Sequence, residues 1–114
     1  MSKYLTNKTI AIDFDGTITE NIPRPAIAPI RFEAIKYIRL LYSRGYKLIL
    51  WTARKDQEFI DCINRLERQS LLGYFIIPES NTGKVRADFY IDDKAYLGKF
   101  NWKRVYKYIV KHIV

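Results

Sequence analysis

Short apolar segments alternate with amphipathic ones along this chain, and this alternation restricts the fold more than any other feature. Segments that read as buried strands lie at residues 9–14, 46–51, 74–77 and 87–91. Helical patterns occupy residues 31–44, which Gly45 ends, a second stretch that Asp56 could cap and Gly73 ends, and the last segment, from Trp102 onward. Strands joined by helices run parallel with right-handed crossovers. We therefore predict an α/β fold with a Rossmann-like doubly wound parallel sheet.

The length and composition predict a single domain spanning residues 1–114. The chain has 114 residues, and 48% of them are hydrophobic, which is enough for one core. No apolar run is long enough to span a bilayer, and the N-terminal segment has no signal-peptide pattern. We expect a soluble, cytoplasmic protein. The lone Cys62 falls in a helical pattern, and we interpret it as a small buried hydrophobe.

Polar side chains follow three of the predicted strands. Asp13 and Asp15 end the first strand, Thr52 ends the second, and Asp92 and Asp93 follow the fourth. Because parallel strands end at one edge of the sheet, four carboxylates converge there if the first and fourth strands are neighbours. Four carboxylates this close repel one another unless a divalent cation neutralises them or some stay protonated, and we infer a cation. Hard oxygen ligands suit Mg²⁺, whereas the Cys and His ligands typical of zinc are missing.

Carboxylates beside Mg²⁺ favour phosphoryl transfer. One carboxylate can attack phosphorus to form an aspartyl-phosphate, and a second can protonate the leaving oxygen and then activate water. The phosphoryl oxygens need positive and hydrogen-bonding groups. Thr52, the backbone amides after Asp13, and Lys84 in the loop before the fourth strand are the candidates.

The order of these motifs resembles the haloacid dehalogenase (HAD) superfamily of phosphotransferases. DFDGT at residues 13–17 is similar to its first motif, and LILWT at 48–52 is similar to its second. Lys84 resembles the third-motif lysine, and YIDD at 90–93 the acidic fourth motif. The resemblance extends over most of the chain, from residue 9 to about residue 95.

The resemblance implies a role for each matching residue. Asp13 would be the nucleophile and a Mg²⁺ ligand, and Asp15 the general acid/base, with its backbone carbonyl on the metal. Thr52 and Lys84 would hold the phosphoryl oxygens. Asp92 and Asp93 would hold the metal, directly or through water. An acid/base at position 15 implies the phosphatase-like members and not the dehalogenases.

The spacing of the motifs leaves no room for the cap domain that most members of this superfamily carry. About fifteen residues separate Thr17 from the first predicted helix, and one helix and one strand fill the stretch from Thr52 to Lys84. A capless site is open, so a large substrate or a partner subunit would have to complete it. The proline-rich loop 21–29, with Arg24, is either a small flap or a connector, and we favour the connector. Arg54 and Lys55, directly after Thr52, either contact an anionic substrate or form a surface pair at the start of a helix.

The leading hypothesis is a Mg²⁺-dependent phosphomonoester hydrolase, whose partner is a phosphorylated small molecule or an accessible macromolecule. The alternative is a non-catalytic binding module that keeps this fold. The net charge is +8, and basic residues mixed with Trp102, Tyr106 and Tyr108 near the C-terminus could bind nucleic acid or protein. A receiver-type phospho-acceptor domain fits less well, because two acids follow the fourth strand. The sequence predicts no membrane partner and leaves the substrate and homo-oligomerisation open.

Overall fold

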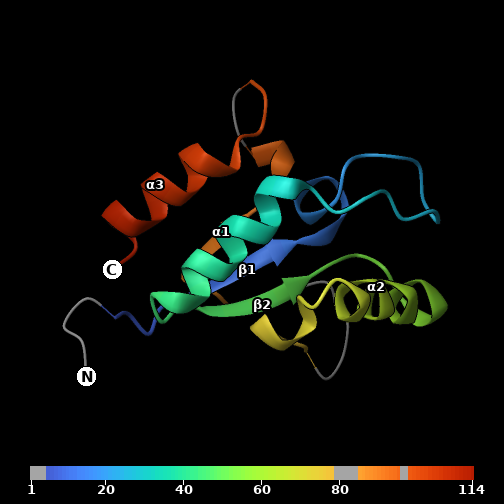
Figure 1. The fold of residues 1–114 in the computed structure, drawn as a ribbon, viewed down its shortest axis with the longest axis horizontal. Helices are drawn as coiled ribbons and strands as arrows, with labels where there is room; N and C mark the ends of the chain where they lie inside the picture. The colour runs from blue at the N-terminus through green and yellow to red at the C-terminus, as the bar shows by residue number, and fades with distance from the viewer. Residues whose placement is uncertain (1–4, 79–84, 96–97) are drawn as a thin grey trace.

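The sheet consists of four parallel strands in the order β3-β2-β1-β4 (Figure 1). The structure is a computed structural model that describes residues 5–78, 85–95 and 98–114. Its strands are β1 (Thr9–Asp13), β2 (Lys47–Trp51), β3 (Phe75–Ile76) and β4 (Phe89–Ile91). Each strand lies within its predicted range and is one or two residues shorter. The predicted Rossmann-like α/β fold is confirmed.

The α-helices are α1 (Phe32–Ser43), α2 (Asp56–Arg68) and α3 (Trp102–His112). Gly45, with a φ of 94°, follows the end of α1 as a C-terminal glycine should. The expectation that Asp56 caps α2 is wrong, because Asp56 is the first helical residue and Lys55 occupies the cap position. The Asp56 carboxylate therefore lies in the first turn, where negative charge interacts favourably with the helix dipole.

The core lies between one face of the sheet and the helices. Ile10 pairs with Leu48 and Ile12 with Leu50, and all four are buried on the same face. The steps from β1 to β2 and from β2 to β3 run in one direction, so right-handed crossovers place α1 and α2 on that face.

The helix α3 lies beside α1, as Figure 1 shows. The Tyr37 and Tyr106 rings, one from each helix, have their centroids 5.2 Å apart. All three described α-helices therefore gather on one face, so the second helical layer that a doubly wound sheet would have does not occur in the described residues. On the opposite face Tyr90 is 40% exposed. Among the described residues, no helix is long and apolar enough to cross a membrane.

The strand order reverses at β1. The chain moves from β1 outward to β2 and β3, and β4 then pairs with the other side of β1. In sheets of this type the ligand crevice lies outside the carboxyl ends of the strands at such a reversal. We therefore expect a ligand site at the carboxyl ends of β1 and β4.

Candidate functional site

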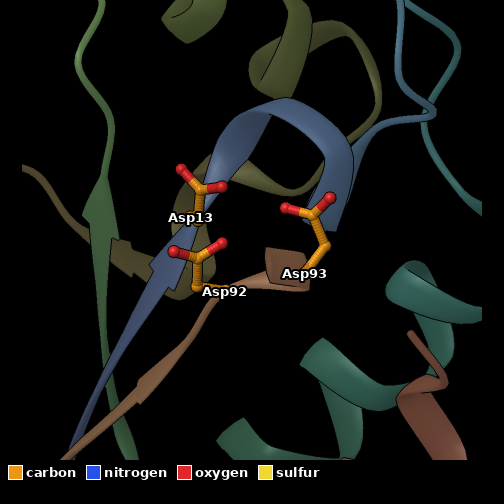
Figure 2. A group of neighbouring side chains, drawn as sticks. All are labelled: Asp13, Asp92 and Asp93. Carbon is orange, nitrogen blue, oxygen red and sulfur yellow. The ribbon is translucent and has the colours of Figure 1, made fainter. Parts of the chain in front are cut away.

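Three carboxylates meet at the point where the strand order reverses (Figure 2). Asp13 is the last residue of β1, Asp92 directly follows β4, and Asp93 begins the short 3₁₀ helix η3 (Asp93–Ala95). One oxygen from each carboxylate lies within 4.8 Å of the others. The structure thus brings together three of the four acidic residues that the sequence pointed to.

A tight turn after β1 shapes this cluster. The turn η1 (Phe14–Ile18) is of the π type, closed by the amide of Thr19 donating to the carbonyl of Phe14 at 3.1 Å. Within it Gly16 has a φ of 82°, and a Cβ atom there would lie 2.7 Å from Asp93 Oδ2. Only glycine combines this backbone conformation with so close an approach of Asp93.

Side chains from distant segments hold the turn in place. The indole Nε1 of Trp102 donates to the Thr17 carbonyl at 2.8 Å, and the Arg31 guanidinium donates to the Gly16 carbonyl at 2.9 Å. The Thr17 hydroxyl accepts from the Asp93 amide at 2.9 Å. It also lies 3.4 Å from Asp13 Oδ2 and 3.3 Å from Asp93 Oδ1, so it can donate to either carboxylate.

The sequence does not predict these supporting roles. Its pattern places Arg31 only at the start of a helix and Trp102 in the core, and Trp102 is indeed buried. No local sequence signal connects either residue to a turn that lies far away along the chain. The threonine of the DFDGT motif is the one available signal, because its position four residues after Asp13 places it in the same turn.

Without a cation, ionisation of the clustered carboxyl groups is disfavoured. Burial, followed by the neighbouring charges of Asp92, Asp93 and Asp15, raises the pKa of Asp13 to about 7, against a smaller lowering by the Phe14 amide. Burial, followed by the charge of Asp92 and a hydrogen bond from it, also raises the pKa of Asp93. A cation among these carboxylates would relieve both effects.

The fourth acid, Asp15, points elsewhere and pairs with Arg54. The Arg54 Nε and Nη2 atoms each lie 2.8 Å from an Asp15 oxygen, in a two-pronged ion pair. The Arg54 side chain is 0% exposed, while that of Asp15 keeps 25% of its surface accessible. Arg54 was expected to contact substrate, and this expectation is wrong because its guanidinium is buried against Asp15.

The other residues singled out in the sequence lie outside the carboxylate cluster or outside the described residues. Thr52 directly follows β2, is buried, and accepts from the Arg54 amide through its hydroxyl at 3.1 Å. Lys55 is exposed. Lys84 lies outside the described residues, so its predicted role stays a prediction. Cys62 is buried as expected, and burial raises the pKa of its thiol to about 12, which makes it an inert thiol.

Comparison with known proteins supports the fold and indicates no activity. No protein-family model and no curated protein matches the chain. A solved structure of a conserved protein from Bacteroides thetaiotaomicron is similar to it, with 32% sequence identity and a TM-score of 0.76. The match covers 93% of this chain and 92% of that one. Because the two chains agree in sequence and fold over nearly their whole lengths, this chain belongs to the same family as that conserved protein.

Proposed function

We propose that this protein is a Mg²⁺-dependent phosphomonoester hydrolase of the HAD type that forms an aspartyl-phosphate on Asp13. The observation that carries the proposal is the convergence of Asp13, Asp92 and Asp93 at the reversal of strand order, with their oxygens within 4.8 Å. The resemblance of the DFDGT, LILWT and YIDD segments to the motifs of that superfamily supports the same chemistry.

The residues present fit a Mg²⁺ ion. Their donors are carboxylate oxygens, the ligands that this hard cation prefers, and Mg²⁺ sites in proteins use few protein ligands beside water and phosphate. The raised pKa of Asp13 also supports a cation site, because neighbouring carboxylates disfavour one another's ionisation unless a cation lies among them. Asp13, Asp92 and Asp93 would hold the ion. When bound, it supplies positive charge that offsets the charge of the carboxylates and of the phosphoryl group.

The chain's own residues would carry out two displacements at phosphorus. In the first, an Asp13 carboxylate oxygen bonds to phosphorus, the ester P–O bond breaks, and Asp15 gives its proton to the leaving oxygen. In the second, a water oxygen bonds to phosphorus, the bond to Asp13 breaks, and Asp15 takes a proton from the water. Thr52 and Lys84 would bind the phosphoryl oxygens through both steps, as the resemblance implies.

The test is hydrolysis of p-nitrophenyl phosphate with and without Mg²⁺. We expect Mg²⁺-dependent release in the wild type and a loss of about 10³-fold or more in Asp13→Asn, which removes the nucleophile. Asp61→Asn is the matched control, because Asp61 is an exposed acid whose carboxylate accepts a surface bond from Gln57 at 2.9 Å. Release that persists in Asp13→Asn would make the covalent mechanism wrong. No release from a wild type that binds Mg²⁺ would make the proposed activity wrong.

A further inference from the structure

Arg54 is a buried cation whose guanidinium is bonded on two sides. On one side, Nε and Nη2 each donate to a carboxylate oxygen of Asp15 at 2.8 Å. On the other, Nη1 donates to the carbonyl of Pro25 at 2.9 Å and Nη2 to that of Ala26 at 2.7 Å. Burying a charge is unfavourable unless partners satisfy it, and here they do. One side chain therefore joins the turn that follows Asp13 to the proline-rich loop.

The proline-rich loop, residues 21–29, is fastened to α2 at further points. Arg65 Nη1 donates to the carbonyl of Ala28 at 3.2 Å, and Arg24 forms an exposed ion pair with Glu58 at 3.3 Å. Of these arginines, Arg54 is the one whose described contacts include both the loop and Asp15. A loop held by Arg54 and at two places along α2 is a fixed wall, which agrees with the connector that we favoured over a flap.

We propose that Arg54 is a positioning residue that fixes the Asp15 carboxylate and the 21–29 loop in one arrangement. This inference rests on the proposed function, in which Asp15 carries the proton. Arg54 has no surface with which to touch a substrate and acts through Asp15. The two parallel bonds set the plane of the carboxylate, which a point-charge lysine cannot do.

The test compares two esters whose leaving groups depend differently on a proton. p-Nitrophenolate leaves readily without protonation, whereas the phenolate of phenyl phosphate depends on it more. Arg54→Lys keeps the positive charge and removes the two-pronged geometry. We expect kcat/KM for phenyl phosphate, which reports only the steps up to departure of the leaving group, to fall about a hundredfold, the loss typical of a misplaced catalytic group, with a much smaller fall of kcat/KM for p-nitrophenyl phosphate. Asp15→Asn should give the same pattern, and the double variant should lose little more than either single one.

The matched control is Arg65→Met, which also releases a loop carbonyl but does not touch Asp15. It should leave the ratio of the two esters unchanged. A second readout, amide hydrogen exchange, does not depend on activity. The amides of Glu20 and Arg31 donate to the carbonyls of Pro29 and Ile18 and close the base of the loop. Their hydrogen exchange should accelerate by about tenfold in Arg54→Lys if Arg54 holds the loop.

The outcomes separate this inference from the function on which it rests. Equal losses on both esters, or losses that add to those of Asp15→Asn, would overturn the positioning role. Unchanged hydrogen exchange in Arg54→Lys would overturn the hold on the loop. A wild type that hydrolyses neither ester would make the proposed function wrong, and the exchange rates would still decide whether Arg54 fixes the loop. A thermal melt of each variant confirms that the loss of activity comes from folded protein.

Discussion

At the scale of single residues, Gly16 brings the backbone close to the carboxylate of Asp93. Its φ is 82°, and a Cβ atom at this position would lie 2.7 Å from Asp93 Oδ2, so Gly16→Ala should displace the Asp93 side chain. We expect Mg²⁺ affinity, measured by calorimetric titration, to fall about tenfold or more, as it does when the support of a metal ligand is disturbed. Gly98→Ala is the matched control, because Gly98 has a φ of +79° but no atoms near a Cβ. Equal losses in the two variants would mean that backbone strain, and not the clash, is responsible.

The Asp13 carboxyl makes the metal-free protein sensitive to pH. Its pKa is about 7 in the folded chain against 3.8 ordinarily, so the folded state binds this proton more tightly than the unfolded state does. The contribution of Asp13 to the free energy of unfolding should therefore be largest below about pH 4 and fall as the pH rises to about 7. Asp13→Asn, which carries no charge, should exceed the wild type by roughly 2–4 kcal/mol at pH 8 and match it near pH 4.

Urea denaturation of both proteins in a chelating buffer measures this difference. Adding Mg²⁺ at pH 8 should stabilise the wild type and not the variant, because only the wild type retains the third carboxylate. An advantage of Asp13→Asn that is as large at pH 4 as at pH 8 would exclude ionisation of Asp13 as its cause.

The residues of the cluster could be predicted from sequence, whereas their supports could not. Asp13, Asp92 and Asp93 were found because strand ends in a parallel sheet share an edge, and that rule needs only the strand pattern. The pairing of Asp15 with Arg54 depends on how a proline-rich loop folds back along α2, and such a path has no periodic signature. A buried arginine therefore looked like a surface arginine in the sequence.

At the scale of elements, each end of α3 is held by one buried side chain that donates a hydrogen bond. At its start the Trp102 indole donates to the Thr17 carbonyl at 2.8 Å. Near its end the Tyr46 hydroxyl lies 3.2 Å from the Ile109 carbonyl. Trp102→Phe and Tyr46→Phe each remove one donor and should each lower the free energy of unfolding by about 1–3 kcal/mol.

The two substitutions should differ in their effect on the metal site. Thr17 lies between Asp13 and Asp93, so Trp102→Phe should also weaken Mg²⁺ binding, whereas Tyr46→Phe should leave it unchanged. Urea denaturation and calorimetric titration of the two variants measure both effects. Equal Mg²⁺ affinities in the two variants would show that the Trp102 bond supports the fold and not the cluster.

Element boundaries were predictable where one physical signal dominates. The apolar runs of β1 and β2 located the strands, and Gly45 located the end of α1. The π-type turn after β1 was not foreseen, because its shape depends on Gly16 together with donors from Arg31 and Trp102. Contacts between distant segments decide such a turn, and local propensity does not.

At the scale of the whole molecule, the exposed face of α3 carries +4 of the net charge of +8. Its exposed basic side chains are Lys103, Arg104, Lys107 and Lys111, and no Asp or Glu occurs after residue 93. Trp102 is in the core, as its place on the apolar stripe predicts, and at 2% exposure its ring cannot stack on bases. Tyr108 is 50% exposed, but its ring already contacts Phe89 and His112. Any attraction of this face for nucleic acid is therefore mainly electrostatic.

Electrostatic binding has a measurable signature, since each phosphate contact releases counterions. We expect single-stranded oligonucleotides to bind with an affinity that falls steeply with salt, and the triple change of Lys103, Lys107 and Lys111 to Gln should reduce the logarithmic slope by about 2. The matched control changes Lys47, Arg68 and Arg86 to Gln, which removes the same charge from exposed positions outside α3. Equal reductions in both variants would assign the attraction to net charge alone. Binding that is absent or insensitive to salt would exclude α3 as a nucleic-acid surface and leave the carboxylate cluster as the sole candidate for function in the described chain.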